Sequence, residues 1–270
     1  MIPKPAHLGP RYAAQFEDES VARAYHTRPP YPDALFDILE GLMPPGPRTV
    51  LDLGCGTGDL AVGFVGRAER IDAVDPSRAM LQVARYRHPS GRLGLHWVES
   101  TAEAYRPDRR YSVIVAAESL HWMEWQDVLS WIPRALAPEA ALALVSGREL
   151  GPLPWSRELS ELLPAFSTNR EYRPYDLVEE LEARSLFCER GRASTAPVAC
   201  AQPVDDYVES FHTRNGFSRE RMAASAAEAF DDALRRLVAP HCPDGWIRSE
   251  TAATVVWGLP RERTMRGGCT

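Results

Sequence analysis

The chain has 270 residues, of which 44% are hydrophobic and 25% charged, which are ordinary values for a globular protein able to bury a sizeable core. The formal net charge of −6 argues against nucleic-acid and anionic-membrane partners, because both attract clustered positive charge. No apolar run is long enough to span a bilayer, and no histidine or cysteine cluster has the spacing of metal ligands, so we expect no membrane association and no metal.

The first 150 residues alternate strand-like and helix-like segments. A proline-rich stretch ends at Pro32, and an apolar helical face then runs from Leu35 to Leu42. Buried-type strands are predicted at 49–53, 70–74, 93–98, 111–116 and 141–146, with helices at about 59–68, 77–86 and 124–136. The alternation predicts an α/β fold whose parallel strands all end at one edge of the sheet. Pro133 should kink the last helix or end it early.

The pattern changes after Gly147. Residues 155–182 indicate helices rich in Trp, Tyr and Leu, and a strand is predicted over 187–197. Helices should follow Pro203 and Ser218, and 251–257 should form a final strand.

A glycine-rich turn follows the first strand, with glycines at 54, 56 and 58 before a helical segment that begins at Asp59. Glycine has no Cβ and tolerates positive φ, so a ligand could lie against the bare backbone there. The next strand ends at Asp75, and 75 − 54 = 21 residues separate it from Gly54, close to the spacing of about 20 at which a carboxylate reaches ribose hydroxyls. Strand, glycine turn, helix and carboxylate together indicate a nucleotide-type site.

Two details favour S-adenosylmethionine over a dinucleotide. The glycines follow G-x-G-x-G, not the G-x-G-x-x-G that packs a pyrophosphate onto a helix. Asp52, just before the first glycine, would repel a pyrophosphate but could bind a free ammonium group.

Four segments in the same order resemble the motifs of class I S-adenosylmethionine-dependent methyltransferases. They are Val50 to Ala61, Asp75 to Leu81, Glu99 to Glu103 and Tyr111 to Ala117. The resemblance covers about residues 28–147 and implies a Rossmann-like, seven-stranded, mostly parallel sheet with an inserted helical cap. It also implies a cofactor site made of Asp52, Gly54, Gly56, Thr57, Gly58, Asp75, Pro76, Ser77, Met80, Thr101, Ala102, Glu103, Ala116 and Ala117. The alternative for Thr101 to Glu103 is that Ser100 or Thr101 caps a short helix, with Glu103 nearby. The chain departs from many relatives at Pro138-Glu139-Ala140, where they have Pro-Gly-Gly.

His121 and Trp122 follow the fourth strand, where this family places residues that face the reacting methyl group. The pair, and the segment from Tyr25 to Pro32, resemble a small-molecule branch that includes trans-aconitate methyltransferase-like proteins. His121 is the candidate catalytic base, with a purely positioning role as the alternative. Tyr25 and Arg28 could hold the methionine carboxylate of the cofactor or only anchor the N-terminal segment.

The aromatic residues outside the sheet suggest an apolar pocket for a planar organic substrate. Trp122, Tyr25, Trp155 and Phe211 are the candidate substrate contacts, although a core position is the alternative for each. We expect an N-terminal lid (1–31), a cofactor-binding core (32–147), a cap with the final sheet hairpin (148–260) and a disordered tail (261–270). Within the third region, the cap itself should comprise 150–182 and 203–246.

The expected activity is methyl transfer from S-adenosylmethionine to an oxygen, nitrogen or carboxylate of a small organic molecule, leaving S-adenosylhomocysteine. The expected setting is secondary metabolism. The alternatives are a macromolecular methyltransferase, an NAD(P)-dependent oxidoreductase on a Rossmann fold, and a non-catalytic S-adenosylmethionine-binding module. Five dispersed cysteines without a C-x-x-C pair, and a first segment without the apolar core of a signal peptide, suggest reduced thiols and a cytoplasmic monomer or homodimer.

Overall fold

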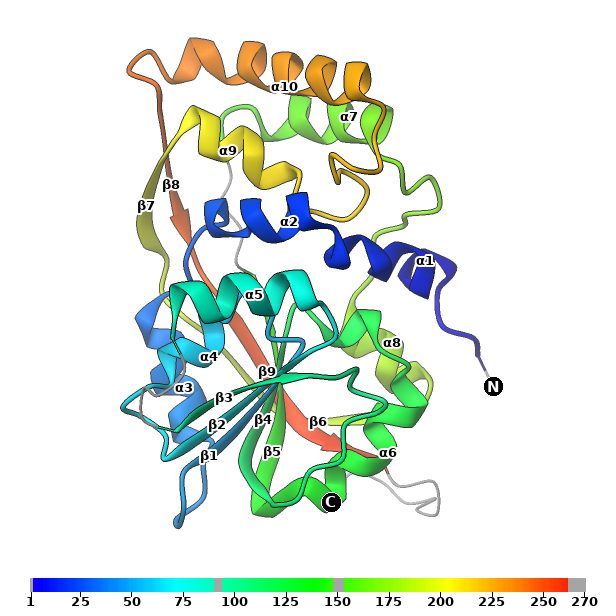
Figure 1. Cartoon of the computed structure of the whole chain (residues 1–270), viewed down its shortest axis with the longest axis vertical. Helices are drawn as coiled ribbons and strands as arrows, with labels where there is room; N and C mark the ends of the chain where they lie inside the picture. Colours follow the sequence, from blue (N-terminus) through cyan, green and yellow to red (C-terminus); the bar gives the residue numbers. More distant parts are fainter. Residues whose placement is uncertain (1, 90–93, 148–152, 262–270) are drawn as a thin grey trace.

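A seven-stranded sheet forms the centre of the molecule. The structure is a computed structural model that describes residues 2–89, 94–147 and 153–261. The strand order is β3-β2-β1-β4-β5-β9-β6, with β9 antiparallel to both of its neighbours and the other pairs parallel (Figure 1). The strands are β1 (Thr49–Leu53), β2 (Arg70–Asp75), β3 (Leu95–Glu99), β4 (Tyr111–Ala117), β5 (Leu136–Ser146), β6 (Phe187–Ser194) and β9 (Thr254–Pro260). The predicted fold class is therefore confirmed.

Helices cover both faces of this sheet, because its strands are apolar on both sides. One face packs against α3 (Asp33–Gly41), α4 (Asp59–Gly63) and α5 (Arg78–Arg87). The other face packs against α6 (Trp125–Ala135) and α8 (Leu177–Ala183), through side chains such as Val128 and Leu181. The sheet thus leaves the carboxyl ends of its parallel strands as the edge where loops can form a site.

Several predicted boundaries shift. The helix expected over 59–68 ends at Gly63, and β5 begins at Leu136 instead of 141. Pro133 lies inside α6, which ends two residues later. Glu139 has φ of +66°, so a side chain occupies a left-handed position.

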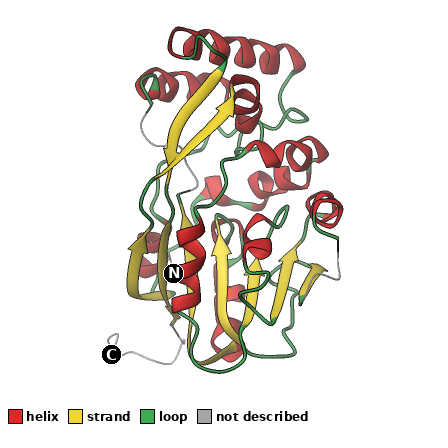
Figure 2. Cartoon of the chain, turned by 90° about the vertical axis from the view of Figure 1, so that its left-hand side faces the viewer, coloured by secondary structure: helices red, strands yellow, loops and turns green. Residues whose placement is uncertain are grey.

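A cap lies above the sheet edge. It consists of α7 (Ser156–Phe166), α9 (Val204–Phe211) and α10 (Ala224–Val238), which share one apolar cluster (Figure 1). A two-stranded ribbon of β7 (Val198–Pro203) and β8 (Trp246–Thr251) joins the cap to the sheet (Figure 2). The strand expected over 251–257 is therefore split between β8 and β9. The cap is also smaller than predicted, because α8 packs on the sheet.

The N-terminal segment lies between the cap and α5 (Figure 1). It contains η1 (Ala6–Leu8), α1 (Pro10–Ala13), η2 (Ala14–Glu17), α2 (Glu19–Ala24) and η3 (Tyr25–Thr27). Val21 and Ala22 of α2 pack against Met80 of α5. On the cap side, Asp18 accepts hydrogen bonds from Ser218 and Arg221. The segment therefore bridges the sheet and the cap.

Three further expectations concern the whole chain. Cys55, Cys200 and Cys242 are free, but Cys188 is disulfide-bonded, so the expectation of reduced thiols is wrong at that position. Among the described residues, no helix has both the length and the apolar character needed to cross a membrane. The tail predicted to be disordered lies, from residue 262 onward, outside the described residues.

Candidate cofactor and active site

The glycine loop between β1 and α4 requires glycine for two physical reasons. Gly54, Gly56 and Gly58 have φ of +75°, +54° and +87°, which side chains rarely adopt. In addition, a Cβ at Gly54 would lie 2.5 Å from the Cβ of Ser119, and one at Gly58 would lie 2.3 Å from the ring of Trp97. The first two amides of the loop, those of Gly54 and Cys55, donate to the carbonyl of Val74, which ties the loop to β2.

Asp75, at the end of β2, is buried beside this loop. Its carboxylate accepts hydrogen bonds of 2.8 Å from the backbone amides of Gly56 and Ser77. Burial raises the pKa of Asp75 to about 6, and the two backbone amides oppose that rise. A carboxylate offers about four lone-pair positions, so two remain to accept hydroxyl groups of a ligand.

Polar atoms without partners surround the loop. Neither carboxylate oxygen of Asp52 accepts a hydrogen bond of normal geometry from the described residues, and the same holds for the hydroxyl of Thr57. Burial raises the pKa of Asp52 to about 8, the carboxylate of Asp75 adds to the rise, and the Ala61 amide counteracts it. Buried polar groups are nearly always paired, so unpaired ones mark a place where a ligand can supply the partner.

The residues after Asp75 organise α5. The Ser77 hydroxyl accepts from the Met80 amide and caps the helix, and Pro76 is exposed. The Met80 side chain is 2% exposed and packs under α2. These positions support Asp75 and the N-terminal segment, and their predicted cofactor contacts stay predictions.

Thr101, Ala102 and Glu103, in the loop after β3, take capping and packing roles. The Thr101 hydroxyl accepts from the Ala104 amide, which is the capping alternative raised above. Glu103 accepts a 2.7 Å hydrogen bond from the Glu124 amide, at the start of α6. Ala102 is buried, and its carbonyl accepts from the Trp131 indole. In this arrangement the side chains of Thr101 and Glu103 are used within the protein.

The end of β4 approaches the glycine loop directly. Ala116 is buried and Ala117 partly buried, in register with the end of β5. Ser119 donates to the carbonyl of Leu53 at the end of β1. Glu118 has φ of +50° and accepts from the Gly147 amide, so the chain turns sharply here before η4 (Leu120–Trp122).

His121 lies in η4 among aromatic rings. Its ring centroid is 4.6 Å from that of Trp122 and 6.0 Å from that of Tyr175. Burial lowers the pKa of His121 to about 3, and Lys4, Arg28 and His7 lower it further by charge. The imidazole is therefore neutral near pH 7, contrary to the near-neutral titration expected for a catalytic base.

The N-terminal segment covers this site. A ring carbon of Tyr25 is 3.8 Å from the position that a Cβ would take at Gly56, so Tyr25 lies over the glycine loop. Arg28 stacks 4.6 Å from the Tyr25 ring and donates to the hydroxyl and the carbonyl of Thr213 at the end of α9. Arg28 thus anchors the segment to the cap, which is the second of the two roles expected for it.

The four candidate substrate contacts separate into two groups. Trp122 packs near His121, and its ring centroid lies 5.4 Å from that of Phe16, while Tyr25 lies over the loop. Trp155 and Phe211 are 3% and 0% exposed inside the cap cluster, where the Trp155 indole donates to the Tyr207 hydroxyl. The core alternative therefore describes Trp155 and Phe211.

The sequence interpretation missed two residues beside His121. They are His7 of η1 and Tyr175 of the segment that leads into α8, with ring centroids 5.3 Å apart. No sequence motif marks either one, because two segments far apart along the chain bring them together. The aromatic composition of 155–182 was the one available signal for Tyr175.

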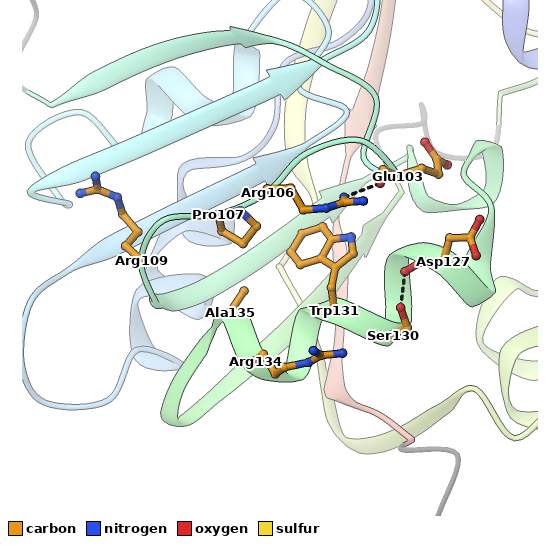
Figure 3. A pocket seen from close by; sticks show the side chains of 9 residues that line it. All are labelled: Glu103, Arg106, Pro107, Arg109, Asp127, Ser130, Trp131, Arg134 and Ala135. Atoms are coloured by element: carbon orange, nitrogen blue, oxygen red, sulfur yellow. Dashed lines mark hydrogen bonds between the residues drawn. The ribbon is translucent and has the colours of Figure 1, made fainter.

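A pocket of about 500 Å³ opens elsewhere, between α6 and the loop that precedes β4. The view in Figure 3 shows Arg106 and Arg134 on either side of the Trp131 ring. Neither the glycine loop nor Asp75 or His121 lines it, so it is not part of the site described above. Among the described residues, no group of histidine, cysteine and carboxylate side chains could hold a metal ion.

Comparisons of sequence identify relatives for the first half of the chain. Residues 50–139 match the family model described as a methyltransferase domain. Uncharacterized methyltransferases of Mycobacterium bovis and Mycobacterium tuberculosis are 34% identical over 136 residues, which is 50% of this chain and 54% of theirs. Trans-aconitate 2-methyltransferase of Streptomyces coelicolor is 35% identical over 127 residues, 45% of this chain and 41% of that protein. The chain thus spans about half the length of the curated relatives it matches.

Solved structures extend the likeness in fold to most of the chain. A putative type II methyltransferase from Anaeromyxobacter dehalogenans superposes with a TM-score of 0.61 at 26% identity, covering 86% of this chain and 97% of that one. A putative methyltransferase from Anabaena variabilis gives a TM-score of 0.55 at 15% identity, covering 85% and 98%, and supports the fold alone.

Proposed function

Because this chain belongs to the class I S-adenosylmethionine-dependent methyltransferases, we propose that it transfers a methyl group from S-adenosylmethionine to a small organic molecule. The observation that carries the proposal is the joint geometry of the glycine loop and Asp75. Three left-handed glycines leave the backbone bare, and the buried carboxylate fixed by Gly56 and Ser77 keeps lone pairs free for ribose hydroxyls.

The residues around the loop fit this cofactor. The unpaired carboxylate of Asp52 would hold the ammonium group of the methionine part, and Thr57 offers a buried hydroxyl. Asp75 would hold the ribose, and Tyr25 would cover the loop. When bound, the cofactor supplies a methyl group already activated on a sulfonium. The protein then contributes mainly by positioning, which can supply on the order of 7–11 kcal/mol.

The properties of His121 favour a role in orienting the acceptor over a role in removing its proton. A general base works best when its pKa lies near the working pH, and burial holds the pKa of His121 at about 3. A neutral imidazole can still donate or accept a hydrogen bond. The acceptor that fits best is therefore a carboxylate or a free amine, either of which can attack without a strong base.

We also propose the class of acceptor, the cellular location and the oligomeric state. Similarity to a protein named trans-aconitate 2-methyltransferase supports a small-molecule acceptor. The cap and the aromatic side chains near His121 are of the kind that encloses one. The net charge of −6 argues against a nucleic-acid partner. We further propose a cytoplasmic monomer or homodimer, with a role in secondary metabolism.

Calorimetric titration with S-adenosylhomocysteine and, separately, with NADH tests the cofactor. We expect the first to bind and the second not to. Transfer of a labelled methyl group from S-adenosylmethionine to candidate acids and amines then tests the activity. Binding of NADH alone would favour the oxidoreductase alternative, and cofactor binding without transfer to any acceptor would favour the non-catalytic module.

A further inference from the structure

The buried side chain of His7 has no hydrogen-bond partner that the structure shows. The residue is 6% exposed, and its Nε2 has no partner among the described residues. Next to it, Asn169 donates from Nδ2 to the backbone carbonyl of His7 at 3.4 Å, and the Oδ1 of Asn169 is also buried and unpaired. Burying a polar group without a hydrogen-bond partner destabilises the folded state. Two such groups, on residues that contact one another, therefore call for a functional explanation.

His7 is connected to His121 through one aromatic ring. The Tyr175 ring centroid lies 5.3 Å from that of His7 and 6.0 Å from that of His121. Tyr172 closes the far side of His7, with a centroid distance of 5.6 Å. The two histidines thus flank the same tyrosine, one from the N-terminal segment and one from the loop after β4.

Further ring contacts connect His121 to the cofactor loop. The His121 ring lies against that of Trp122, and the Trp122 ring lies 5.4 Å from Phe16. Phe16 and Tyr25 pack in one cluster, and Tyr25 covers Gly56. In this succession of contacts the glycine loop comes first, His121 is in the middle and His7 comes last.

We propose that His7 determines which acceptor binds, by a hydrogen bond from its Nε2 to an oxygen at the far end of a planar, aromatic small molecule. The rings of Trp122, His121 and Tyr175 provide the apolar surface for the plane of that molecule. The inference rests on the proposed function, because it assumes that the reacting end of the acceptor lies beside His121 and the cofactor.

The test uses the full chain saturated with S-adenosylhomocysteine and three probes that share a single benzene ring, namely benzoate, phenol and toluene. Their binding is followed by the imidazole NMR signals of His7 and His121. We expect benzoate or phenol to shift both signals and to bind about tenfold more tightly than toluene, as a hydrogen bond worth about 1.4 kcal/mol would produce. His7→Phe should abolish that preference and leave the affinity for toluene unchanged. His7→Gln should restore most of it.

Calorimetry with S-adenosylhomocysteine distinguishes a failure of the proposed role of His7 from a failure of the proposed function. We expect His7→Phe to bind it within about twofold of the wild type, since His7 comes last in the succession of contacts that starts at the loop. Failure of the wild type to bind it would count against the proposed function. If the wild type binds it, the role of His7 is overturned by any of three results: no probe binds, the probes shift His121 alone, or His7→Phe keeps the preference for oxygen-bearing probes. With an acceptor in hand, His7→Phe should raise KM and leave kcat nearly unchanged.

Discussion

The carboxylate of Asp75 accepts a 2.8 Å hydrogen bond from the backbone amide of Gly56. The end of β2 therefore holds the loop after β1 in place through this bond. Any ligand that bonds to Asp75 also acts on the loop. A ligand that binds Asp75 should consequently also change how well the glycine loop is ordered.

Replacing Asp75 should weaken cofactor binding. Asp75→Ala removes the charge-assisted hydrogen bonds to ribose and the support of the loop, so we expect a loss of about 1.5–3 kcal/mol in S-adenosylhomocysteine affinity by calorimetry. Burial raises the pKa of Asp75 to about 6, so the acceptor form becomes populated as the pH rises from 5 to 7. Wild-type affinity should increase over that range, and Asp75→Asn should lose the increase. Wild-type affinity in both variants would remove Asp75 from the site.

Asp52→Asn should stabilise the ligand-free protein. The carboxyl of the unfolded chain ionises near pH 4, and burial holds the pKa of the native group at about 8. Between these values the native state binds one more proton, so stability falls as the pH rises, by up to about 1.4 kcal/mol per pH unit. Asparagine cannot lose that proton.

The free energy of unfolding that Asp52→Asn gains over the wild type should therefore grow from pH 5 to pH 8, as measured by urea unfolding. The exposed Asp232→Asn is the control and should show no such trend. Parallel pH curves for Asp52→Asn and the wild type would contradict the buried, unpaired state of Asp52. The same variant should lose affinity for S-adenosylhomocysteine, because the ammonium group loses its counter-charge.

His121 should act without titrating near neutral pH. Since burial lowers its pKa to about 3, the imidazole is already neutral at pH 5.5, and turnover should show no inflection from it between pH 5.5 and 8. His121→Ala should mainly raise KM, and His121→Asn should partly rescue it through a restored hydrogen bond. If His121→Ala instead lowers kcat by about 10²–10⁴-fold and abolishes an inflection near neutrality, His121 is a base after all.

Arg28 should hold the N-terminal segment closed. Arg28→Ala removes two hydrogen bonds to Thr213 and the stacking on Tyr25, so hydrogen exchange over residues 10–28 should speed up by about tenfold, as expected for a loss near 1.4 kcal/mol. Arg23→Ala, on the exposed side of α2, is the control. S-adenosylhomocysteine should slow exchange in the wild type, and equal exchange with and without it would indicate a fixed wall.

Glu139→Gly should increase stability. Glu139 is exposed at φ of +66°, a conformation that costs a side-chain-bearing residue about 1–2 kcal/mol and glycine almost nothing. After the extra flexibility of glycine in the unfolded chain is allowed for, a gain of up to about 1 kcal/mol should remain in urea unfolding. Glu139→Ala keeps the Cβ and should gain little. Equal effects of the two substitutions would mean that φ is not the cause.

Local sequence patterns were enough to predict the sheet and the cofactor loop. The strand over 49–53, the glycines and Asp75 depend on periodicity and on backbone freedom, both of which are properties of short segments. The capping of α6 by Glu103 was not predictable, because it depends on where the Glu124 amide lies after folding. In the same way, only tertiary structure shows that Trp155 and Phe211 fill the cap.

The surroundings of His121 were the least predictable part. His7 and Lys4 belong to a segment far away in sequence, and their charges add to the burial of the His121 ring in lowering its pKa. Tyr175, also distant in sequence, packs near the same ring. Histidine alone suggests a group that titrates near neutrality. Its burial and its cationic neighbours, which no sequence motif indicates, lower its pKa far below neutrality.

Ser194 and Thr254 pair in register across β6 and β9, and their hydroxyls lie 2.8 Å apart. The chain leaves the sheet at the first residue, builds β7, α9, α10 and β8, and returns at the second. That part of the cap is thus topologically an enlarged hairpin turn, whose length and content the sheet does not constrain. A different excursion grafted between these two positions would keep the β6–β9 pairing but remove Thr213, and with it the bonds that anchor Arg28 of the N-terminal segment.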